Sequence, residues 1–74
     1  MHAFTEIHDF KLDNYLPHIG WIGAYTTCKI YSKEGSQNYF LHDERTDRLF
    51  EFSTGGEKLK SREQADRVIA AYNL

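Results

Sequence analysis

The sequence predicts a small α+β domain, in which a three-stranded antiparallel β-meander carries a C-terminal α-helix packed on one face. Two patterns predict this fold class. Residues 21–53 contain three runs rich in β-branched and aromatic side chains, separated by polar turns. Residues 61–72 instead repeat apolar side chains at helical spacing. Because such a helix has a single apolar stripe, we expect the stripe to dock on the sheet.

The three strands are expected over residues 21–32, 37–43 and 48–53. Polar segments follow the first two strands and predict tight turns between them. The third strand ends at the paired glycines 55 and 56, because glycine readily adopts the left-handed backbone that a tight turn needs. Successive side chains of a strand point to opposite faces, so each run also predicts which residues face the core.

The expected core lies between one face of the meander and the helix. In the second strand the alternation is ambiguous, since either Phe40 or the pair Tyr39 and Leu41 can point inward. The other strands give an unambiguous set of core residues, which are Ile22, Ala24, Cys28, Ile30, Phe50 and Phe52.

The helix is expected over residues 61–72. Ser61 and Gln64 have the spacing of a capping box, in which each side chain bonds the backbone N–H of the other residue. The apolar stripe falls at positions i, i+3, i+4 and i+7 and consists of Ala65, Val68, Ile69 and Tyr72.

The first twenty residues have the weakest pattern. Asp9 is a candidate cap for a short helix over residues 9–16, with Pro17 just beyond its end. An extra edge strand over about residues 5–12 is the alternative. We expect a short helix or irregular structure in this segment.

Size and charge limit the classes of function. At 74 residues the chain is expected to form one domain, residues 1–74, with little core to hollow into a deep pocket. Its net charge of −2 argues against the basic surface of most nucleic-acid binders. A lone cysteine excludes an intramolecular disulfide, and neither a membrane span nor a signal peptide is apparent. The expected location is cytoplasmic.

The face opposite the helix is the main candidate surface. It carries Trp21, Tyr25, Lys29 and Tyr31 in one row of the first strand, and Arg45 and Arg48 beside it are candidates for a polar rim. Aromatic side chains are enriched at protein interfaces, and they also stack on nucleic-acid bases. A third interpretation is that the N-terminal segment packs on this row as a second small core.

No pattern predicts catalysis, a metal or a cofactor. The four histidines do not share the paired spacing of zinc ligands. Cys28 falls on the core face, where a cysteine behaves as a small apolar residue. Glycines 55 and 56 precede a helix but lack the spacing of a phosphate-binding loop. We therefore expect no enzyme activity and no bound cofactor.

The sequence thus favours a small non-catalytic protein-binding module. Compact domains of this size with one cysteine and no motif are common among phage and mobile-element proteins that inhibit a host protein. We therefore expect the module to be, in its more specific form, a stoichiometric inhibitor of a host protein. The expected partner is another protein, or a second copy of the chain, at the sheet face. The first alternative is a nucleic-acid-binding module that uses the aromatic and basic residues of that face. The second is a subunit of a larger enzyme assembly.

Overall fold

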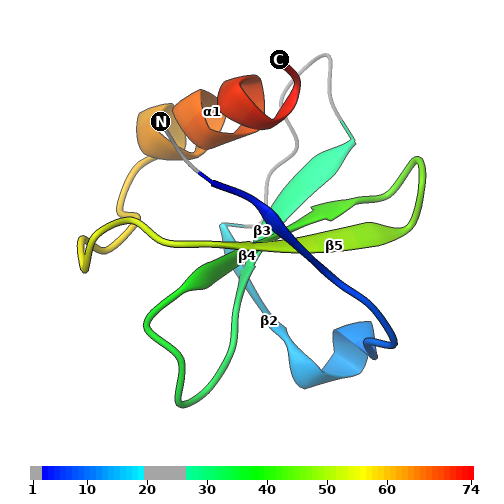
Figure 1. Cartoon of the computed structure of the whole chain (residues 1–74). Helices are drawn as coiled ribbons and strands as arrows, with labels where there is room; N and C mark the ends of the chain where they lie inside the picture. Colours follow the sequence, from blue (N-terminus) through cyan, green and yellow to red (C-terminus); the bar gives the residue numbers. More distant parts are fainter. Residues whose placement is uncertain (1–2, 20–26) are drawn as a thin grey trace.

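A computed structural model describes residues 3–19 and 27–74, which form a five-stranded antiparallel sheet and one α-helix. The strands lie side by side in the order β1-β5-β4-β3-β2, and Figure 1 shows α1 across one side of the strongly twisted sheet. The elements in chain order are β1 (Thr5–Ile7), the 3-10 turn η1 (Leu12–Asn14), β2 (Leu16–Ile19), β3 (Cys28–Ser32), β4 (Tyr39–Asp43), β5 (Arg48–Phe52) and α1 (Arg62–Tyr72).

The predicted α+β class and C-terminal helix are confirmed, and the three expected strands correspond to β3, β4 and β5. The number of strands was wrong, because β1 and β2 add one strand at each edge of the meander. Part of the expected first strand, residues 21–26, lies outside the described residues. The described part of that strand, β3, begins at Cys28.

The N-terminal segment differs most from its prediction. The short helix expected over residues 9–16 is reduced to η1, and the alternative strand over residues 5–12 is confined to β1. Both edge strands are too short for a clear alternation, with three residues in β1 and four in β2. Pro17 within β2 also argues against a strand unless the strand lies at an edge. Pairing with β5 and β3 therefore decides these elements rather than local preference.

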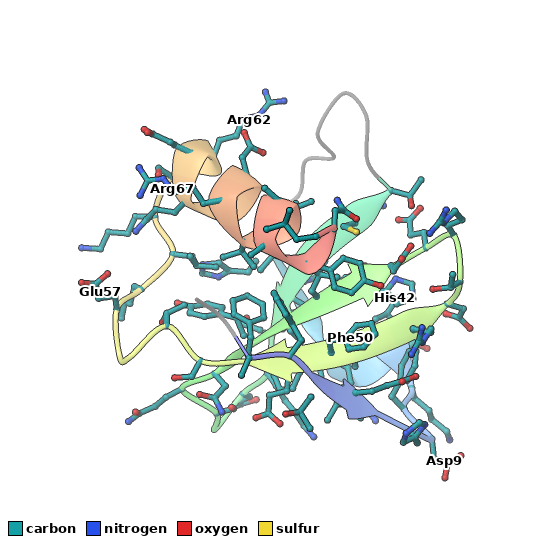
Figure 2. The ribbon with its side chains drawn as sticks, turned by 45° about the horizontal axis from the view of Figure 1, so that its top comes forward. Asp9, His42, Phe50, Glu57, Arg62 and Arg67 are labelled. Carbon is teal, nitrogen blue, oxygen red and sulfur yellow. The ribbon has the colours of Figure 1, made fainter. Side chains whose placement is uncertain are left out.

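The helix begins as predicted. Ser61 is the N-cap, and its Oγ accepts a hydrogen bond from the backbone N–H of Gln64 at 3.2 Å. The side chain of Gln64 accepts in return from the backbone N–H of Ser61 at 3.1 Å, which completes the capping box. Figure 2 shows Arg62 and Arg67 pointing away from the sheet, so the opposite stripe of α1 faces the core.

The main core lies between α1 and the sheet, as predicted, and it settles the ambiguity in β4. Tyr39 and Leu41 point toward α1, whereas Phe40 points to the other face. Leu59, in the connection before α1, was not expected in the core. Ile22 and Ala24 lie outside the described residues. The buried members are Cys28, Ile30, Tyr39, Leu41, Phe50, Phe52, Leu59, Ala65, Val68 and Ile69, with Phe4 and Tyr72 packed against them.

A second, smaller core covers the opposite face of the sheet. The strands β1 and β2 are consecutive in the chain but lie at opposite edges, so residues 8–15 must connect the two edges. Phe10 and Leu12 of this connection pack against the second face. The buried members of this core are Tyr15, Tyr31, Phe40 and Leu49. Every residue of the central strand β4 is consequently buried.

Candidate functional site

The residues predicted to bind a partner do not form one surface in the described structure. Trp21 and Tyr25 lie outside the described residues. Tyr31 is only 8% exposed, because it belongs to the second core that the N-terminal segment covers. The three cations predicted for the surface, Lys29, Arg45 and Arg48, gather at the end of the sheet that carries the β4–β5 turn.

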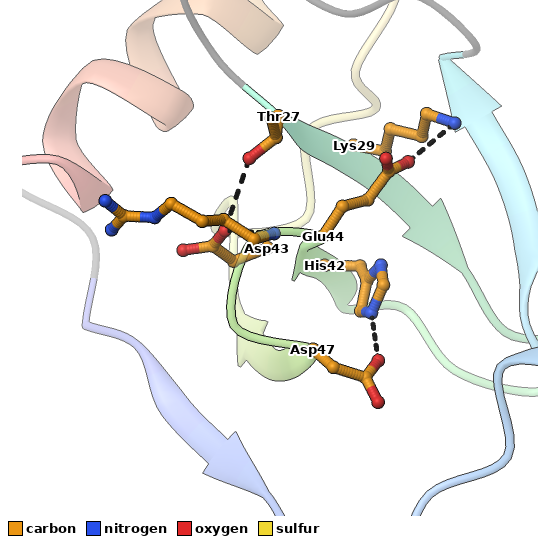
Figure 3. A network of polar contacts seen from close by, with 7 residues as sticks. Thr27, Lys29, His42, Asp43, Glu44 and Asp47 are labelled. Carbon is orange, nitrogen blue, oxygen red and sulfur yellow. Dashed lines mark hydrogen bonds and ion pairs between the residues drawn. The ribbon is translucent and has the colours of Figure 1, made fainter.

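A network of polar contacts occupies this end of the sheet (Figure 3). Its most buried carboxylate is Asp43, at the end of β4, which is 4% exposed. The carboxylate accepts hydrogen bonds from the hydroxyl of Tyr72 at 2.9 Å, the backbone N–H of Arg45 at 3.1 Å and the hydroxyl of Thr27 at 3.4 Å. Burial acts to raise the pKa of Asp43, but these donors together hold that pKa below its ordinary value. Burial of the Tyr72 hydroxyl, together with its hydrogen bond to Asp43, raises the pKa of Tyr72 to about 12.

The predicted surface cations are largely matched by nearby carboxylates. Lys29 Nζ lies 2.7 Å from Glu44 Oε1, and this bond raises the pKa of Lys29. Arg48 donates through two nitrogens to Glu6, at 2.6 and 3.0 Å. That fork lowers the pKa of Glu6 and raises that of Arg48. Such pairs contribute little to stability, because they are largely exposed to water.

His42 is the buried imidazole of this end of the sheet. Its Nε2 lies 2.8 Å from Asp47 Oδ1, and since a carboxylate oxygen accepts, Nε2 is the donor. Its ring packs edge-on against Phe10 and Tyr31. The other nitrogen, Nδ1, is buried without a hydrogen-bond partner among the described residues. Within residues 3–19 and 27–74, no group of three or more histidine, cysteine, aspartate or glutamate side chains is placed to hold a metal ion.

An open cleft of about 570 Å³ lies at the other end of the sheet. This volume falls within the roughly 300–1,000 Å³ typical of ligand sites. Two walls stand on either side of a floor formed by β2, β3 and β4. One wall is the β3–β4 turn, and the other is the loop at residues 56–58. The floor residues are Leu16, His18, Ser32 and Tyr39.

The floor of this cleft continues the main core to the edge of the sheet. Leu16 pairs with Ser32, Ser32 with Tyr39 and Tyr39 with Phe52, so the four side chains form one row on the same face. Phe52 and Tyr39 are buried, Ser32 is half-buried and Leu16 is 59% exposed. The row therefore begins inside the core and ends in water on the edge strand β2.

Two aromatic rings fix the loop that forms the second wall. His18 donates through Nε2 to the carbonyl oxygen of Leu59 at 2.7 Å. The backbone N–H of Leu59 donates in turn to the hydroxyl of Tyr39 at 3.1 Å. The two rings lie 4.7 Å apart between centroids. Side chains of β2 and β4 therefore hold the chain next to the loop that forms the second wall.

Charged side chains of both signs line the two walls. The β3–β4 turn contributes Lys33 and Glu34, and the other loop contributes Glu57 and Lys58. Figure 2 shows Glu57 directed outward, on the opposite side of the molecule from Asp9. The ammonium of Lys33, however, lies 5.2 Å from the centroid of the Tyr15 ring, which belongs to the core on the opposite face of the sheet.

Leu16 and His18, which flank Pro17, were not predicted as site residues. An apolar residue and a ring at i and i+2 around a proline are compatible with an edge strand, and this was the available signal.

Among the described residues, no helix is long or apolar enough to span a bilayer, and α1 has 11 residues. No protein-family model, no curated protein and no solved structure matches the chain.

Proposed function

We propose that this chain is a small non-catalytic protein-binding module, and that the cleft ending at Leu16 is its binding surface. One observation supports the proposal. Leu16 is 59% exposed at one end of a cross-strand row, and the other end of that row, Phe52, lies in the main core. A partner that covers Leu16 would extend an existing apolar core instead of starting a new one. Burial of apolar surface is the main driving force of protein association.

Exposed leucines are common on protein surfaces, so exposure alone says little. Leu16 differs because it lines a cleft of suitable size, together with Tyr39 of the main core. The other large hydrophobic residue that is exposed among the described residues is Leu74, which lines none of the described pockets. Leu74 therefore serves as a matched control for Leu16.

Two polar side chains of the cleft are bonded to the backbone. His18 uses Nε2 to hold a backbone carbonyl group, and the hydroxyl of Ser36 accepts from the backbone N–H of Asn38 at 3.1 Å. An inhibitor that occupies the surface of a host protein is one form of the proposed module. The predicted role of Trp21 and Tyr25 in binding a partner stays a prediction, because both residues lie outside the described residues.

The test is affinity capture of partners from a lysate of the source organism, with three immobilised forms of the chain. The wild type and Leu74→Asp are expected to retain the same protein, whereas Leu16→Asp is expected to lose it. Circular dichroism must first show that both variants are folded. Equal retention by all three forms would place the binding surface elsewhere and refute the proposal.

A further inference from the structure

We draw no further inference here: the strongest candidate, the open cleft that ends at Leu16 on the edge strand β2, is the site already described, and nothing in the structure shows what covers it.

Discussion

The hydroxyl of Tyr72 lies 2.9 Å from Oδ2 of Asp43, so the last turn of α1 is bonded to the end of the central strand. The two residues are 29 positions apart in the chain. Tyr72 is the donor, because the ionised carboxylate can only accept. The protonation of either partner therefore affects how α1 is held, and the two pKa shifts predict the direction.

Asp43 is expected to make the fold sensitive to acid. The pKa of Asp43 is lowered below its ordinary value of 3.8, so its contribution to stability is present above that value. The contribution is lost as the pH falls through the lower pKa of the folded state. Urea unfolding across this range should show a smaller pH dependence for Asp43→Asn than for the wild type. Some acid dependence will remain, because the pKa of Glu6 is also lowered. Identical slopes for the two proteins would contradict the assignment.

Tyr72 is expected to make the fold sensitive to alkali. Its pKa rises from 10.0 to about 12 in the folded state, so the folded chain keeps the proton where the unfolded chain has lost it. Stability is then fully present below pH 10.0 and decreases as the pH rises toward 12. Tyr72→Phe is expected to remove this decrease. The midpoint of urea unfolding, measured through this range for both proteins, is the check. Parallel curves would exclude Tyr72 as the source.

Truncation of Ile69 is expected to test the docking of α1. Ile69 is buried in the main core, and replacing a buried isoleucine by alanine costs about 2–5 kcal/mol. A domain of this size has a total free energy of unfolding of about 4–11 kcal/mol. Ile69→Ala should therefore lower the melting temperature sharply or unfold the protein. The conservative variant Ile69→Val should cost only about 0.5–1.5 kcal/mol. Similar melting temperatures for both variants would show that α1 is not docked as described.

Cys28 is expected to be unreactive in the folded protein. It is 2% exposed in the main core and takes part in no disulfide. A thiolate is the reactive form, and a reagent must also reach it. Labelling by a chromogenic thiol reagent should be slow under native conditions and fast in denaturant. Fast labelling of the native protein would mean that this end of β3 opens readily.

The elements that the sequence predicted are those with two independent signals. For α1, the apolar stripe and the Ser61–Gln64 pair agree, and the helix is found where expected. In β4, both faces are covered, so an alternating pattern is missing and Phe40 could not be distinguished from Tyr39 and Leu41. Strands buried on both faces read as continuous apolar runs.

The remaining elements depend on contacts that are distant in the chain. β1 exists because Thr5, Glu6 and Ile7 pair with β5, more than forty positions away in the chain. Likewise, Leu16 became recognisable as part of a cleft only once its row with Ser32 and Tyr39 was known. No local preference encodes such pairings, and Pro17 pointed away from a strand. The sequence therefore predicted the centre of the sheet, offered the edge strand β1 only as an alternative, and missed the edge strand β2 that carries Leu16.

The connection of residues 8–15 has a consequence for how the fold comes apart. It joins β1 at one edge to β2 at the other, and its Phe10 and Leu12 pack on the face between them. Loss of this packing would release both edges together, since neither is a separate hairpin of its own. Cooperative units of this kind open as one in native-state hydrogen exchange. The two edge strands, although farthest apart in the sheet, are therefore expected to exchange their amide protons with a common opening free energy.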